Sequence, residues 1–173
     1  MIQEGGTVDA VYSALVGESR AQEDKATLKE NASLVFKAME EMNIDVIEVD
    51  YDGGGDCGEF HGATAYTKTD DGSPWKPLDI SWPSLLVSRR VSTFDDTGKW
   101  ISSVEKRETL MDEVVAGMAQ KLVYMHHPGW ETNDGGRGNV YFYRNKTIKV
   151  DHEYYVIETE SHTHEFEFSD APV

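Results

Sequence analysis

The feature that most constrains the fold is an alternation of apolar and acidic residues over residues 47–52, within an expected strand at residues 45–52. Successive side chains of a β-strand point to opposite faces of its sheet. The apolar set is Ile47, Val49 and Tyr51, and the acidic set is Glu48, Asp50 and Asp52. The pattern predicts a strand with one apolar face and one acidic face, ended by the glycines at residues 53–55.

Two segments have helical periodicity instead. Residues 21–42 carry apolar side chains at steps of three and four, at Leu28, Ala32, Val35, Met39 and Met42. A second helix is predicted to begin at Thr109, whose hydroxyl is expected to cap it, and to end at Pro128-Gly129. Its stripe is Leu110, Val114, Met118, Leu122 and Met125. A shorter helix is expected at residues 8–16, broken at Gly17.

Most of the rest of the chain is predicted to be β-structure. The expected strands lie at residues 59–67, 85–94, 100–104, 139–144, 147–155 and 156–168, and residues 68–84 read as a loop. The predicted fold class is α+β, with an antiparallel sheet of about four to six strands and two main helices packed on one face. We expect a single domain over residues 1–173, with a disordered tail at 1–6 and a folded core at 7–168.

The net charge of the chain limits the kinds of molecule that we expect it to bind. The net charge is −16, and residues 1–60 carry 14 acids against 4 bases, whereas residues 61–127 carry 9 against 8. An acidic field repels nucleic acid and anionic membranes and favours cations or basic protein surfaces. No apolar run is long enough to span a membrane, and the start of the chain lacks the pattern of a secretory signal. With a single cysteine, Cys57, these features predict a cytoplasmic protein.

The first candidate site is the glycine-acid turn at residues 50–59. Its ligand candidates are Asp52, Gly55 and Asp56, because acids beside exposed backbone carbonyls can bind a divalent cation. The spacing does not fit an EF-hand loop, and no Gly-Lys-Ser/Thr element of a phosphate-binding loop is present. The alternative is a tight β-turn with solvated acids.

The second candidate is the turn at residues 129–138, which holds Trp130, Glu131 and Asp134. In the functional interpretation, Glu131 and Asp134 are catalytic acid or base candidates, or ligands, beside a tryptophan wall. In the structural interpretation, Trp130 closes the edge of the core and the Asn-Asp-Gly-Gly run forms the turn.

A third candidate lies near the C-terminus. In an extended strand Glu158, Glu160, His162 and His164 would share one face, and His152 on the preceding strand could join them. Imidazole pairs of this kind bind transition metals, so His152, His162 and His164 are candidate ligands for a divalent metal. The alternative is a set of exposed histidines on an edge strand that bind nothing.

Four motifs in order resemble a family of short bacterial and phage or plasmid proteins classed only as a domain of unknown function. They are residues 52–58 (DGGGDCG), 109–113 (TLMDE), 127–138 (HPGWETNDGGRG) and 161–166 (SHTHEF). Cys57 stands where the family commonly has serine. The resemblance covers about residues 28–166, implies a phage or mobile-element origin, and brings no activity with it.

Two functions from different classes follow. The first is an acidic binding or accessory protein that docks on a protein partner with a basic surface, as an inhibitor or a nucleic-acid mimic, without binding nucleic acid or membrane itself. The second is a metal-assisted or acid–base enzyme, which requires the two glycine-acid turns and the C-terminal histidines to converge.

Overall fold

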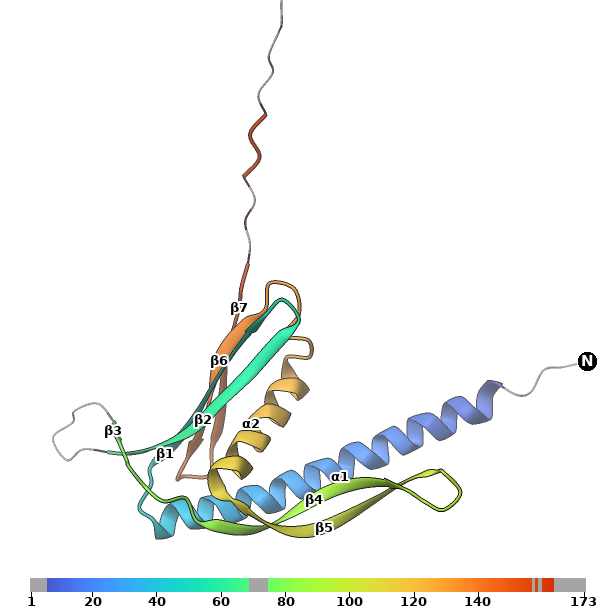
Figure 1. The fold of residues 1–173 in the computed structure, drawn as a ribbon, viewed down its shortest axis with the longest axis horizontal. Helices are drawn as coiled ribbons and strands as arrows, with labels where there is room; N and C mark the ends of the chain where they lie inside the picture. Colours follow the sequence, from blue (N-terminus) through green and yellow to red (C-terminus); the bar gives the residue numbers. More distant parts are fainter. Residues whose placement is uncertain (1–5, 69–74, 157, 159, 164–173) are drawn as a thin grey trace, which may run out of the picture.

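The computed structural model describes residues 6–68, 75–156, 158 and 160–163, with the backbone alone for residues 6–21 (Figure 1). The helices and strands are α1 (Gly6–Glu41), β1 (Val46–Gly54), β2 (Cys57–Thr67), β3 (Lys76–Pro77), β4 (Ser84–Phe94), β5 (Trp100–Leu110), α2 (Met111–His126), β6 (Gly136–Tyr143) and β7 (Ile148–Tyr154). The predicted α+β class is confirmed. Neither helix, within the described residues, combines the length and the apolar character needed to cross a membrane.

The strands form two sheets. The larger has the order β3-β2-β1-β6-β7, and each neighbouring pair is antiparallel. β1 is the central strand, so the segment with the apolar/acidic alternation is paired on both sides. The smaller sheet is the β4–β5 hairpin, which runs beside α1 (Figure 1). The five strands of the larger sheet lie within the predicted range of four to six.

One face of the larger sheet is buried against the helices. Both helices lie on the same side of it, and α2 contacts β2 and β1 (Figure 1). Ile47, Val49 and Tyr51 are buried there, as the alternation predicts. A bulge opposite Asp50 leaves both Phe60 and Ala63 of β2 packed against the core. The fully buried side chains with the largest volumes are Trp130, Tyr51, Phe142, Met39, Ile44, Ile47 and Met111.

Helix α2 begins two residues later than predicted. Thr109 lies in β5, where it pairs with Leu85, and no side chain caps the helix. The prediction of a Thr109 cap was wrong because strand pairing continues to Leu110 and satisfies this part of the backbone. Met111 at the start of the helix donates its N–H to the carbonyl of Pro83 at 2.9 Å.

The apolar stripe of α2 is also rotated from the predicted one. Val114 and Met118 are buried as expected, but Leu110 and Met125 are exposed. The buried set is Met111, Val114, Val115, Met118, Ala119 and Val123. The helix is apolar on more than one stripe, so the sequence permits both orientations and the packing selects one.

Helix α1 runs through Gly17 without a break. One glycine inside a helix costs about 1 kcal/mol, which is too little to end it, so the predicted break was wrong. Its second half packs as predicted, with Val35 and Met39 fully buried. Asn31 fixes it to the hairpin through two hydrogen bonds to the backbone of Ser88, at 3.0 and 3.1 Å.

The strand predicted at residues 156–168 does not form in the part that the structure describes. Residues 156, 158 and 160–163 have no regular secondary structure. The last backbone hydrogen bond of this region joins Tyr155 N–H to Gly135 C=O at 3.1 Å. His164 and residues 1–5 of the predicted tail lie outside the described residues.

Candidate functional site

The two glycine-acid turns, about 75 residues apart in the chain, lie against each other. The N–H of Gly55 donates to the carbonyl of Asn133 at 2.9 Å, and the N–H of Asp56 donates to the carbonyl of Glu131 at 3.1 Å. Asp56 and Asn133 have positive φ, which sets the curvature of each turn. The convergence that the enzyme hypothesis requires is therefore met for the two turns.

Trp130 fills the space between the turns. Its side chain is 1% exposed, and its ring meets Tyr51 and Phe60 edge to face. A Cβ added at Gly58 would lie 2.4 Å from the indole, and one added at Gly53 would lie 2.7 Å from it. Glycine is therefore required at both positions, because the indole packs directly on them. The burial of Trp130 agrees with the structural interpretation of this residue.

The carboxylates of the two turns have separate surroundings. Glu131 Oε1 accepts a hydrogen bond from the Tyr124 hydroxyl at 3.2 Å, and its Oε2 is buried without a partner among the described residues. Asp52 Oδ1 accepts one from the Tyr155 hydroxyl at 3.0 Å. Asp56 and Asp134 are exposed. Among the described residues, no group of three histidines, cysteines or acids is placed to hold a metal ion.

The two candidate histidines that the structure describes have different surroundings. His152 points to the buried face of the sheet from β7, with Nδ1 2.7 Å from the Tyr51 hydroxyl. His162 is exposed beside Glu160, outside any strand, and His164 lies outside the described residues. His152 also stacks on His127, with ring centroids 4.0 Å apart. The sequence explains His127 by its place near a helix end, and nothing in it indicates this pairing.

His152 should make the stability depend on pH near neutrality. Burial lowers the pKa of His152 below the ordinary value of 6.5, and His127 lowers it further. Because the folded pKa lies below the unfolded one, the contribution to stability is complete above about pH 6.5 and is lost as the pH falls below it. We expect urea unfolding between pH 8 and 5.5 to show a flatter pH dependence for His152→Phe than for the wild type.

The matched control for this experiment is His61→Gln. His61 is exposed, and its Nε2 lies 3.9 Å from Asp50 Oδ2. Its pH profile should follow the wild type. If His61→Gln flattens the profile and His152→Phe does not, the assignment of the pH dependence to His152 is wrong.

The opposite face of the larger sheet has no described helix over it (Figure 1). We call this surface the open face and define it by the outward residues of β1, β6 and β7, which are Glu48, Asp50, Asp52, Arg137, Tyr141, Tyr143, Lys149, Asp151 and Glu153. Three adjoining hollows of about 490, 450 and 330 Å³ mark it. The acidic face that the alternation predicts is therefore a contoured surface.

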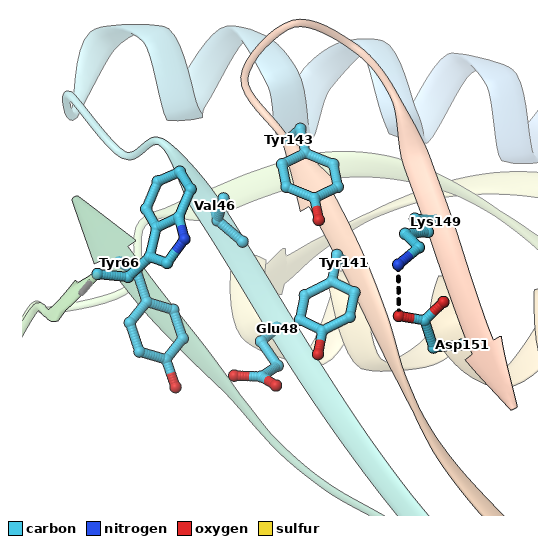
Figure 2. A pocket seen from close by; sticks show the side chains of 8 residues that line it. Val46, Glu48, Tyr66, Tyr141, Tyr143, Lys149 and Asp151 are labelled. Atoms are coloured by element: carbon cyan, nitrogen blue, oxygen red, sulfur yellow. Dashed lines mark hydrogen bonds and ion pairs between the residues drawn. The ribbon is translucent and has the colours of Figure 1, made fainter. Parts of the chain in front are cut away.

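The largest hollow, which we call the aromatic hollow, is shown in Figure 2. It is lined by Val46, Glu48, Tyr66, Trp75, Tyr141, Tyr143, Lys149 and Asp151. The second hollow continues from Trp75 and Tyr143 toward Asp45 and Arg144. The third, at the other end, has four acids in its lining, which are Asp50, Asp52, Asp151 and Glu153.

Glu48 affects the pKa of two tyrosines of the aromatic hollow. Burial raises the pKa of Tyr141 to about 12, and the charge of Glu48 and a hydrogen bond to it act in the same direction. Burial also raises the pKa of Tyr66, and Glu48 again acts in the same direction. Both tyrosines are therefore neutral over the usual pH range.

The sequence profile of one family matches residues 27–166, which is most of the chain. The chain belongs to DUF6878, a family of unknown function. No curated protein and no solved structure matches the chain significantly. The resemblance noted from the four motifs is therefore confirmed at the level of the family.

The DUF6878 match takes in both glycine-acid turns and all of the open face. It begins at Thr27, inside α1, and so leaves out the first part of that helix. Tyr66, Trp75, Tyr141 and Tyr143 are the functional candidates that sequence reasoning missed. The sequence does contain a pattern that could have identified Tyr141 and Tyr143. They alternate with buried residues in β6, as the acids of β1 alternate with buried residues in that strand.

Proposed function

We propose that this protein is an acidic binding module that docks a basic surface of a protein partner on its open face. The observation that carries the proposal is a sheet face with no described helix over it, hollowed in three places and lined by carboxylates and aromatic rings. Sheet faces that are not packed on a core are usually plain polar surfaces. Aromatic side chains are enriched in protein interfaces, and carboxylates supply electrostatic complementarity to a basic partner.

The acids on the open face form an ordered set. Glu48, Asp50 and Asp52 lie on alternate positions of β1, about 6.7 Å apart along the strand. Asp151 and Glu153 continue the acidic surface on β7, two strands away. With a net charge of −16, such a surface attracts a basic groove over a long range. An inhibitor that occupies the basic groove of a nucleic-acid-binding protein is one form that this function takes.

A basic peptide tests the proposal. A twelve-residue peptide of alternating lysine and serine should bind the wild type, and its Kd should rise about tenfold or more between 50 and 300 mM NaCl, measured by calorimetry. The same peptide with glutamate in place of lysine should not bind. Salt-independent binding, or equal binding of the acidic peptide, would contradict the proposal.

Two triple variants of equal net charge locate the site. The first neutralises the open face, with Glu48→Gln, Asp50→Asn and Asp52→Asn. The second neutralises the β4–β5 hairpin, with Asp96→Asn, Glu105→Gln and Glu108→Gln. The first should abolish binding of the lysine peptide and the second should leave it close to the wild type. Equal losses would show that net charge, and not the open face, attracts the peptide.

A further inference from the structure

We infer that the aromatic hollow is a subsite for one cationic side chain of the partner, a lysine or an arginine, held at Glu48 between the rings of Tyr66 and Tyr141. This inference rests on the proposed function and assigns one part of the open face a specific task. It commits to a protein-borne cation as the occupant, because the docking surface as a whole is complementary to a basic protein.

The geometry of the hollow supports this assignment. Glu48 projects from the central strand, Tyr66 from β2 on one side and Tyr141 from β6 on the other (Figure 2). Glu48 pairs directly with Tyr141 across β1 and β6, and Tyr66 lies diagonally opposite it on β2. A cation above this carboxylate would be flanked by ring faces, an arrangement that attracts ammonium and guanidinium groups.

The chain's own lysines already use this surface in the same way. Lys149 lies with Nζ 5.9 Å from the centre of the Tyr141 ring and 2.6 Å from Asp151 Oδ2. At the other rim, Lys68 lies with Nζ 5.5 Å from the centre of the Trp75 ring. Two ammonium groups thus rest on aromatic rings of the hollow, which shows that its chemistry accepts this kind of group.

Glu48 has no cationic partner among the described residues. Three other acids at or near this face do have one: Asp151 is paired with Lys149, Glu153 with Arg137, and Asp45 with Arg144. Tyr66 and Tyr141, which line the hollow with Glu48, are neutral. A partly buried carboxylate in an aromatic hollow therefore retains an uncompensated charge, and a cation from outside would neutralise it.

Single substitutions test the subsite with the lysine-serine peptide as the probe. Glu48→Gln keeps the size of the side chain and a hydrogen-bonding group but removes the charge, and should raise the Kd about tenfold. Tyr141→Leu removes one ring and should raise it about threefold to tenfold. The matched controls are Asp96→Asn, which removes one charge from the hairpin, and Phe94→Leu, which removes one exposed ring there; both should bind like the wild type.

The outcomes separate this inference from the proposed function. If the wild type binds, the open-face triple variant does not, and Glu48→Gln binds like Asp96→Asn, then docking stands and the subsite is wrong. If the wild type does not bind the peptide, the proposed function is wrong as well. Circular dichroism and thermal melting identify a variant that does not fold. If Tyr141→Leu does not fold, Glu48→Gln still tests the subsite, because Glu48 lies on the outer face of the sheet.

A free small molecule with an ammonium group could also supply the cation. Lysine amide should bind at least a hundredfold more weakly than the peptide, because it occupies the aromatic hollow alone and does not contact the other acids of the open face. In two-dimensional NMR, both probes should shift the backbone amides of Glu48 and Tyr141. Binding of lysine amide as tight as that of the peptide would overturn the assignment to a protein partner.

Discussion

Replacing Trp130 by alanine should lower the free energy of unfolding by about 3–5 kcal/mol, the range seen when a buried tryptophan or phenylalanine is truncated. Trp130 is 1% exposed, and its indole contacts the rings of Tyr51, Phe60 and Tyr124. Its removal would leave a cavity beneath both glycine-acid turns, which the glycines that contact it cannot fill. Urea denaturation followed by circular dichroism measures the loss.

The control for this prediction is Trp100→Ala. Trp100 lies at the tip of the β4–β5 hairpin, 59% exposed, and stacks on Phe94 alone among the described aromatic rings. Its truncation should cost about 1 kcal/mol or less. A loss for Trp130→Ala as small as that for Trp100→Ala would show that the indole does not join the two turns to the core.

Replacing Gly135 by alanine should cost about 3 kcal/mol or more. Gly135 has a φ of 82°, in the left-handed region, which costs roughly 1–2 kcal/mol for a residue with a Cβ. In addition, the new Cβ would lie 1.9 Å from the carbonyl oxygen of Gly53 and 2.6 Å from the Cα of Gly54. These are backbone atoms of the other turn, so relief requires the two turns to separate.

Gly98→Ala separates the two causes. Gly98 has a φ of 77°, nearly that of Gly135, but a Cβ there would meet no atom within 4 Å. Gly98→Ala should therefore lower the free energy of unfolding only by the conformational cost, roughly 1–2 kcal/mol. Thermal or urea unfolding of the two variants gives the difference. If they are equally destabilised, the contact between the turns contributes nothing to the stability.

Much of the fold follows from periodicity. The alternation at residues 47–52 correctly predicts that Ile47, Val49 and Tyr51 are buried, because a step of two in a strand leaves only one choice of face. Val46 is also buried, although it lies on the face of Glu48. Residues 21–42 are correctly assigned to a helix for a similar reason. The errors fall where local signals compete with long-range pairing. Thr109 has the chemistry of a helix cap, but its backbone is already paired with Leu85 across the hairpin.

The candidate site was predictable in part. The sequence identifies Trp130 and both glycine-acid turns as unusual, and the structure places them in contact. It does not identify Tyr66 and Trp75, which reach the aromatic hollow from separate parts of the chain. Nor does it pair His152 with His127, since stacking of two rings from a helix end and an edge strand leaves no mark on local composition.

The sequence by itself determined that the central strand has one apolar and one acidic face, because side-chain direction in a strand depends only on the parity of position. It also determined the net charge of −16 and hence the sign of the field around the protein. Only the tertiary structure decided that tyrosines from β2 and β6 flank Glu48. The order of strands in a sheet depends on contacts between distant segments, and these are set by the packing of the whole core.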